Sequence, residues 1–220
     1  MDTLNQHEIF EIEVLDKLKS YRLLESLVFG GGSMLRLCHE LNRYSVDLDF
    51  WFVKSLNQKI YFNKIQQTFK KEYELTDAQI KHFTILIELR SPIYPRRLKI
   101  DIRREMKAWD WQEKIAFSRF SNKQVLVKAH TLEQTMENKV LAFIEREEVR
   151  DCFDIEFMLR RGIELPIELK APLKEMKKKL ARLSDSDFKV KLGSILDDEN
   201  REYYISNRFS YLKEKLTSIL

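Results

Sequence analysis

Residues 29–52 read FGGGSMLRLCHELNRYSVDLDFWF, and the rest of the chain can be placed around them. The apolar run at 27–29 predicts a short buried strand. The glycines at 30–32 predict a tight turn into a helix over 33–41, because glycine allows sharp turns and close approach of a ligand to backbone N–H groups. The positive end of that helix suits phosphate, and Ser33 offers a hydroxyl donor there. A plain strand-to-helix turn is the alternative interpretation of the glycines.

Two carboxylates follow on a predicted strand over 45–52. Alternate side chains of a strand leave the same face, so Asp47 and Asp49 should point one way while Leu48 and Phe50 point into a core. Two neighbouring carboxylates repel each other, and burying either is costly. A divalent metal ion between them would relieve both problems.

A third carboxylate, Asp101, lies on another predicted strand, 97–104, with sequence RLKIDIRR. If this strand lies beside the Asp47–Asp49 strand, three acidic side chains converge. Such a set can hold one or two Mg²⁺ ions, with water and substrate phosphates completing the coordination. The alternative is that Asp101 is a surface residue paired with Lys99 or Arg103.

Composition limits the class of protein. The chain has 220 residues, of which 44% are hydrophobic and 34% charged, a composition typical of an ordered protein. Its net charge of +4 is compatible with an anionic partner but does not require one. Cys38 and Cys152 are expected to be small buried thiols in a reducing compartment. The N-terminus is polar, with no signal peptide expected, and no apolar run approaches the roughly 20 residues of a membrane span, so we expect a cytoplasmic protein. There is no Walker GK[ST] sequence, and Leu35 stands where a dinucleotide fingerprint needs glycine.

The chain changes character near Ala129. Further helices over 4–25 and 56–72 and a strand over 82–89 complete an α+β domain over residues 1–128, and residues 129–220 are predicted to form a helical domain. Thr131 with Gln134 predicts a helix start. A second helix over 149–161 should stop at Gly162.

Two charged features have plain interpretations. Arg150 and Asp154 stand four residues apart on the second helix, so a surface ion pair would explain them. The basic stretch 96–107 is followed by Trp109, Trp111, Phe117 and Phe120. Nucleic-acid binding is one interpretation, but a solvated strand face and a helix that packs its aromatic side chains inward are favoured.

Five blocks in order resemble one known family, the nucleotidyltransferases of the AbiEii/AbiGii toxins, which belong to bacterial abortive-infection and related toxin–antitoxin pairs. The resemblance covers roughly residues 25–162. The matching positions are Gly31, Gly32, Ser33 and Leu35; Arg43, Ser45, Asp47 and Asp49; Asp101; Lys139 and Ala142; and Arg150, Asp151 and Asp154. The resemblance implies a small mixed β-sheet nucleotidyltransferase core flanked by helices, with a C-terminal helical bundle.

The resemblance also implies a catalytic set of Asp47, Asp49, Asp101 and Lys139. The first two would hold two Mg²⁺ ions around the triphosphate of an NTP. Asp101 would share the second metal ion and help to deprotonate the attacking hydroxyl, and Lys139 would neutralise phosphate charge. The implied nucleotide-binding set is Gly31, Gly32, Ser33, Arg43, Ser45, Lys139, Asp151 and Asp154, in which either Asp151 or Asp154 orients the lysine or the nucleoside.

The function implied is transfer of NMP from NTP to an acceptor hydroxyl, with the 3′ end of tRNA as the leading acceptor. The chain would act as the toxin of a toxin–antitoxin system, with a cognate antitoxin encoded alongside. Two alternatives remain open at this point: nucleotidylation of a protein hydroxyl, and a non-catalytic module that binds nucleotides or a partner. A glycosyltransferase is a more distant alternative, since D-x-D also occurs in those enzymes.

Overall fold

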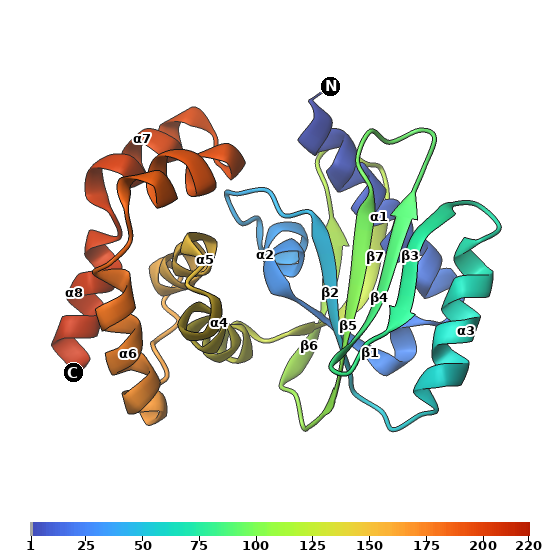
Figure 1. Cartoon of the computed structure of the whole chain (residues 1–220), viewed down its shortest axis with the longest axis horizontal. Coiled ribbons are helices and arrows are strands. Elements are labelled where there is room, and N and C mark those ends of the chain that lie inside the picture. Colours follow the sequence, from blue (N-terminus) through green and yellow to red (C-terminus); the bar gives the residue numbers. More distant parts are fainter. Residues whose placement is uncertain (1) are drawn as a thin grey trace. The chain divides into compact units, whose positions relative to one another are not determined.

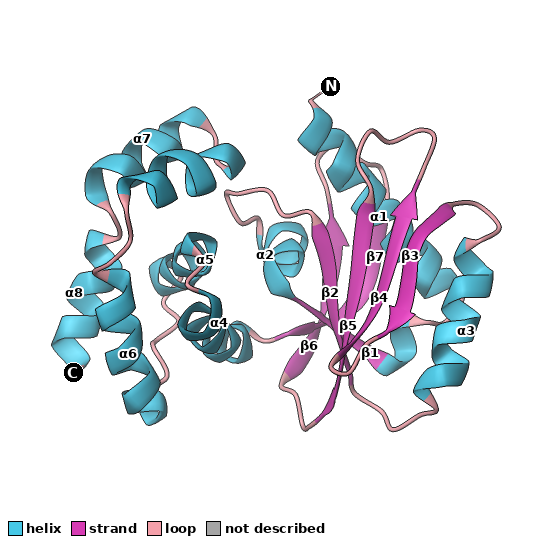
Figure 2. Ribbon diagram, viewed as in Figure 1, coloured by secondary structure: helices cyan, strands magenta, loops and turns pink. Residues whose placement is uncertain are grey.

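The computed structural model describes residues 2–220 and divides into two compact units. The first unit comprises the chain up to Glu40 and Tyr44–His130, and the second comprises Leu41–Arg43 and Thr131–Leu220. Strands occur in the first unit, and helices make up nearly all regular structure of the second (Figure 2). This confirms the α+β class expected from the sequence.

The first unit is built on a mixed seven-stranded sheet with strand order β3-β4-β5-β2-β1-β7-β6. Two neighbouring pairs, β1 with β7 and β2 with β5, are parallel, and the other pairs are antiparallel. The strands are β1 Leu27–Gly30, β2 Asp47–Phe52, β3 Glu74–Ile80, β4 Thr84–Arg90, β5 Leu98–Met106, β6 Trp111–Phe117 and β7 Gln124–His130. Strand β2, which carries the paired aspartates, therefore lies in the middle of the sheet (Figure 1).

Alternation along the central strands produces one apolar and one polar face. On β2, Leu48, Phe50 and Phe52 are fully buried, and Leu98, Ile100 and Ile102 of β5 are buried in the same way. Their neighbours Asp47, Asp49 and Asp101 are half-buried on the opposite face. The core therefore lies on one side of these strands and the acidic side chains on the other, as the alternation predicts.

Three helices complete the first unit: α1 Thr3–Ser20, α2 Gly31–His39 and α3 Gln58–Phe69. Helix α1 ends five residues before the predicted boundary, because Arg22 adopts the left-handed conformation at φ 56° and turns the chain into a short 3₁₀ turn, Leu24–Ser26. Helix α2 begins directly at the second glycine of the triplet. The thiol of Cys152 is buried and that of Cys38 half-buried, and both are free.

One predicted element is wrong. Residues 111–117 form the edge strand β6, whereas the sequence favoured a helix that buries its aromatic side chains. Trp111 and Phe117 are 43% and 37% exposed. Among the described residues 2–220, strand β6 pairs with β7 alone, and an edge strand can alternate without burying its apolar residues.

The second unit contains α4 Leu132–Arg146, α5 Val149–Arg160, α6 Lys170–Leu180, α7 Asp198–Asn207 and α8 Ser210–Ile219, with a π-helical segment, Asp187–Leu192, before α7. Helix α4 begins as predicted, with the Thr131 side chain accepting a hydrogen bond from the Gln134 N–H at 3.2 Å. Helix α5 ends before Gly162, which has φ 83°, the expected left-handed stop. Within residues 2–220, no helix is long and apolar enough to cross a membrane.

Candidate active site

The three predicted carboxylates are brought to one face of the sheet. Strand β2 lies parallel to β5, and their register places Asp49 directly beside Asp101. Residues opposite each other on neighbouring strands project to the same side, and Asp47 shares that side because it lies two residues from Asp49. Asp101 therefore joins the Asp47–Asp49 face, which is the arrangement on which the three-carboxylate hypothesis depends.

A lysine balances part of this negative charge. Lys99 pairs with Asp101 at 2.5 Å, Nζ to Oδ2, so the alternative of an ion pair along β5 is also present. Partial burial would lower the pKa of Lys99, but its hydrogen bond to Asp101 and the charges of Asp101, Asp47 and Asp49 outweigh that effect and raise it. The charges of all three carboxylates therefore act on Lys99.

Gly31 fits closely against one of the carboxylates. It has φ 74°, a conformation that L side chains rarely adopt, and a Cβ atom added there would lie 2.9 Å from both Cβ and Cγ of Asp49. Any side chain at Gly31 would therefore displace the Asp49 carboxylate. The turn needs glycine at this point, and it brings Asp49 against the N-terminal end of helix α2.

Ser33, predicted to contact phosphate, has a fully buried side chain. Its Oγ lies 2.7 Å from Oε1 of Glu11 and 2.6 Å from the carbonyl oxygen of Asp47. A hydroxyl carries one hydrogen, so it cannot donate to both oxygens at once. Phosphate binding by the Ser33 hydroxyl stays a prediction, whereas its hydrogen bonds to α1 and β2 are observed.

Glu11 resolves this conflict if it is protonated. The residue is 1% exposed, and burial raises the pKa of its carboxyl well above the usual range, although the Ser33 hydrogen bond opposes the shift. A protonated Glu11 can donate to Ser33, which then donates to the Asp47 carbonyl. This buried relay holds the start of α2 against the first residue of the carboxylate strand, and no motif in the sequence indicates it.

The donor set of the carboxylate face fits a hard divalent cation. Asp47, Asp49 and Asp101 offer only oxygen ligands, which Mg²⁺ prefers. Within residues 2–220, no three His, Cys, Asp or Glu side chains are arranged as a ready-made metal cage. Mg²⁺ commonly binds through one or two carboxylates together with substrate phosphates, so such a cage is not required for it.

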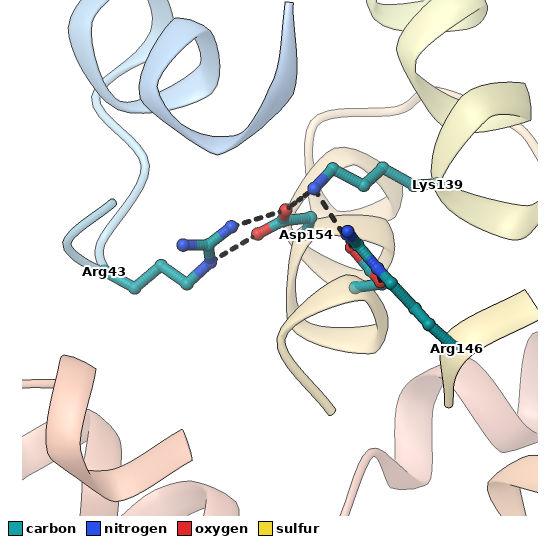
Figure 3. A network of polar contacts seen from close by, with 5 residues as sticks. Arg43, Lys139, Arg146 and Asp154 are labelled. Atoms are coloured by element: carbon teal, nitrogen blue, oxygen red, sulfur yellow. Dashed lines mark hydrogen bonds and ion pairs between the residues drawn. The ribbon is translucent and has the colours of Figure 1, made fainter. Parts of the chain in front are cut away.

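The second unit carries its own polar cluster, which is buried (Figure 3). Asp154 of α5 is fully buried and accepts two hydrogen bonds from Arg43, at 2.6 Å from Nε and 2.7 Å from Nη2. Lys139 of α4 places Nζ 2.6 Å from Oδ2 of the same carboxylate. A surface pair between Arg150 and Asp154, the plain interpretation of their spacing, is therefore wrong, because Asp154 points into the unit and pairs with Arg43 and Lys139.

The neighbouring carboxylate, Asp151, is also fully buried. It accepts hydrogen bonds from Nε and Nη2 of Arg146, both at 2.7 Å, and lies 3.1 Å from Nζ of Lys139. Burial alone would raise the pKa of Asp151, but the charge of Lys139 and the hydrogen bonds of Arg146 lower it to about 2. Lys139 thus bridges the two carboxylates, and both Asp151 and Asp154 belong to one network.

The remaining predicted residues have simpler surroundings. Gly32 is buried in the first turn of α2, and Ser45 is half-buried two residues before β2. Arg43 is 3% exposed and belongs to the second unit through its contact with Asp154. Sequence reasoning did not assign a role to Arg146, although its position on α4 five residues before Asp151 was a usable signal.

Comparisons with known proteins agree with this architecture. Two Helicobacter pylori structures are similar to the chain at 20% identity. That of JHP933 has TM-score 0.56 and coverage of 96% of this chain and 94% of that one, and a second structure has TM-score 0.58 and coverage of 96% and 97%. MenT4, a nucleotidyltransferase toxin from Mycobacterium tuberculosis, has TM-score 0.50 and 13% identity, with coverage of 97% and 89%. No curated protein gave a significant match.

At these identities the solved structures support the fold alone. The sequence itself matches the family model of the nucleotidyl transferase AbiEii toxin of type IV toxin–antitoxin systems over residues 13–204. That match spans the carboxylate face of the first unit and the buried network of the second. The chain therefore belongs to the AbiEii family of nucleotidyltransferase toxins.

Proposed function

We propose that this chain is a Mg²⁺-dependent toxin that transfers NMP from an NTP to the 3′-terminal hydroxyl of tRNA. The single observation that carries the proposal is the register of β2 and β5, which sets Asp49 beside Asp101 on the face shared with Asp47. Nucleotidyl transfer needs acidic groups at such a point, to hold divalent cations and to receive the proton of the attacking hydroxyl.

The proposed donor site lies where Asp49 meets the start of α2. The backbone N–H groups of Gly31 and Gly32 stand in the first turn of that helix, where N–H groups lack partners within the helix. They would donate hydrogen bonds to the β- and γ-phosphates, and the helix dipole would favour the departing pyrophosphate. Gly31 is suited to this role because it has no side chain between the backbone and the ligand.

The three carboxylates would have different roles. Asp47 and Asp49 would hold Mg²⁺, which when bound neutralises phosphate charge and stabilises the entering and leaving oxygens. Asp101 would accept a hydrogen bond from the acceptor hydroxyl and take its proton as the oxygen bonds to the α-phosphorus. Lys99 would release Asp101 for this step or remain beside it as a neutralising charge.

In the second unit, Lys139 is proposed to contact the triphosphate with the donor that its ion pairs leave available. An ammonium group has three N–H donors, and two of them are directed at Asp151 and Asp154. The two carboxylates would thereby fix the position of Nζ. Arg43 would act as a positioning residue because it holds Asp154.

The family implies an antitoxin partner, and we propose that one is encoded alongside this chain. Action on tRNA also requires that the chain reach the translation machinery. The cytoplasmic location expected from the sequence stays a prediction.

The test is to incubate the purified protein with total tRNA, Mg²⁺ and each α-³²P-labelled NTP in turn. Asp47→Ala and Asp101→Asn should abolish labelling of the tRNA band, whereas Asp16→Ala, on the partly exposed surface of α1, should not. Label that appears on a nuclease-resistant protein band would instead identify a protein acceptor. Growth inhibition that survives Asp49→Ala would favour the non-catalytic alternative.

A further inference from the structure

An aromatic cluster adjoins the carboxylates on the same face of the sheet. Trp51 lies two residues beyond Asp49 on β2, so its side chain leaves the same face. Its ring centroid is 4.7 Å from that of His130 and 5.8 Å from that of Trp109. A Cβ atom on Gly30 would come within 2.5 Å of the Trp51 ring and 2.8 Å of His130. Because Gly30 has no side chain, the rings of Trp51 and His130 can pack directly against the backbone next to Gly31 and Gly32.

Trp109 and His130 are buried, at 7% and 0% exposure, and the aromatic cluster reaches solvent at the sheet edge through Trp111. The register of β6 and β7 pairs Trp111 with His130, so both project to the face that carries Trp51. Trp111 is 43% exposed. It lies on β6, the last strand in the order of the sheet. A flat indole surface is thus presented to solvent on the carboxylate face.

Cations accompany each of these indoles. Arg103 pairs with Trp51 in the register of β2 and β5, two residues beyond Asp101. The ammonium of Lys107 lies 4.0 Å from the Trp109 ring centroid, and that of Lys128 lies 5.2 Å from the Trp111 ring centroid. We call these six residues the aromatic–basic strip: Trp51, Trp109, Trp111, Arg103, Lys107 and Lys128.

The cations of the strip are not held in ion pairs with carboxylates in the described part of the chain. Within residues 2–220, Arg103 and Lys107 form no ion pair with a carboxylate, and both are exposed. Lys128 donates to the backbone carbonyl of Glu25 at 2.7 Å, which does not neutralise it. The acidic residue opposite Lys128 on β6 is Glu113. The exposed acidic residues Glu105 and Asp110 also lie along this stretch, so the strip offers separate cations beside acidic groups, and it borders the carboxylates at Arg103.

We propose that the aromatic–basic strip binds the single-stranded segment of the RNA acceptor next to its reacting 3′ end. Cations that track phosphates and aromatic rings on which bases stack are the two elements of single-strand binding. Arg103 lies about 7 Å along β5 from Asp101, one repeat of the strand pleat. An RNA held there would present its terminal hydroxyl to Asp101, and this inference rests on the proposed function.

The experiment measures RNA binding without catalysis. A labelled short single-stranded RNA is titrated with the full chain in EDTA, without NTP, and anisotropy is recorded over a series of salt concentrations. Trp111→Ala should weaken binding between about 5-fold and 100-fold, whereas Trp111→Phe should retain most of it. Arg103→Gln and Lys107→Gln should each reduce the slope of log K against log salt by about 0.7.

The matched control is Arg182→Gln, an exposed arginine that follows α6 in the second unit. Unchanged binding in the strip variants, or equal weakening by Arg182→Gln, would overturn the inference. Strip-dependent binding by a protein that labels no RNA would uphold the RNA surface while refuting the proposed transfer. If the protein transfers label to RNA but the strip variants bind RNA as well as the wild type, the proposed transfer would be upheld and the RNA surface refuted.

Discussion

Replacing Asp154 with asparagine should destabilise the second unit more than any other single isosteric change in its polar network. The carboxylate is fully buried, and it compensates Arg43 and Lys139, whose side chains are 2% and 8% exposed. Asparagine keeps the shape but removes the charge, which leaves two cations with too little compensation. Removing one partner of a buried ion pair costs about 3–5 kcal/mol, a third or more of the total stability of many domains.

The matched variant is Asp151→Asn. Asp151 is equally buried, but its main partner Arg146 is 40% exposed and can turn toward water. Lys139 would still be paired with Asp154. The expected loss is therefore smaller, about 1–3 kcal/mol, because it is mainly the loss of charged hydrogen bonds.

A double variant separates charge compensation from packing. In Arg43→Met with Asp154→Leu, the Arg43 charge and its partner are both removed, and Lys139 keeps Asp151. Replacing a buried ion pair by apolar side chains is often neutral or stabilising. We expect this variant to be more stable than Asp154→Asn.

Urea unfolding followed by far-UV circular dichroism measures these free energies, since the second unit is largely helical. The three tryptophans, at positions 51, 109 and 111, all lie in the first unit, so their fluorescence reports that unit separately. Equal losses for Asp154→Asn and Asp151→Asn, or a loss below about 1 kcal/mol for Asp154→Asn, would refute the reasoning.

Three further predictions follow from the first unit. Gly31→Ala should lower the free energy of unfolding by about 1–2 kcal/mol, because alanine is strained in the left-handed conformation, and a denaturation curve would measure this loss. It should also abolish nucleotide transfer in the labelling assay, because the new Cβ would displace Asp49. A fully active variant would show that Gly31 does not pack closely against Asp49. Because burial raises the pKa of Glu11, its neutral form should stabilise the fold at low pH, and this stabilisation should decline as pH rises above about 4.5. Glu11→Gln should remove that decline in a pH series of unfolding curves, and an unchanged slope would argue against a protonated Glu11. Burial, and to a smaller extent the charge of Lys107, lowers the pKa of His130 to about 4. The free energy of unfolding of the wild type should therefore fall as pH drops from about 6.5 to 4. His130→Gln should make this fall shallower, and an equally steep fall in the variant would refute the role of His130.

The central strands could be predicted because burial imposes a pattern on them. Alternation between Leu98, Asp101 and their neighbours identified both the strand and its polar face. Local sequence could not show that β5 lies beside β2, because the register of distant strands depends on packing across the whole sheet. The resemblance to a family supplied the reason to expect that Asp101 joins the other carboxylates.

The edge strands were missed for the opposite reason. Strand β3 contains little apolar alternation and is mostly exposed or half-buried. Strand β6 exposes Trp111 and Ile115 to solvent. In a sequence, such large apolar residues normally indicate core positions, so the pattern was misleading here. Strands β3 and β6 form because they pair with β4 and β7, and the residues of an edge strand alone carry little information about that pairing.

The buried relay and the ion-pair network show what spacing alone misses. Glu11 has no motif around it, and only the tertiary fold reveals that it meets Ser33. Arg150 and Asp154 have ideal helical spacing for a surface pair, yet the contact with Arg43 spans 111 residues of sequence. Asp154 pairs with a distant residue because its side chain faces inward, where Arg43 and Lys139 together compensate its charge.

The separation between Arg43 and Asp154 also has a consequence for biosynthesis. A ribosome that adds about 5–20 residues per second makes the aspartate roughly 5–20 s after the arginine. During that interval Arg43 cannot yet pair with Asp154, while the strands that precede and follow it in sequence are already synthesised. The second unit can complete its buried network only by capturing a segment synthesised long before it. A fragment that begins at Thr131 would therefore lack Arg43 and leave the buried Asp154 with too little positive charge around it. We expect the helical unit to fold stably only when it is expressed together with the preceding sheet.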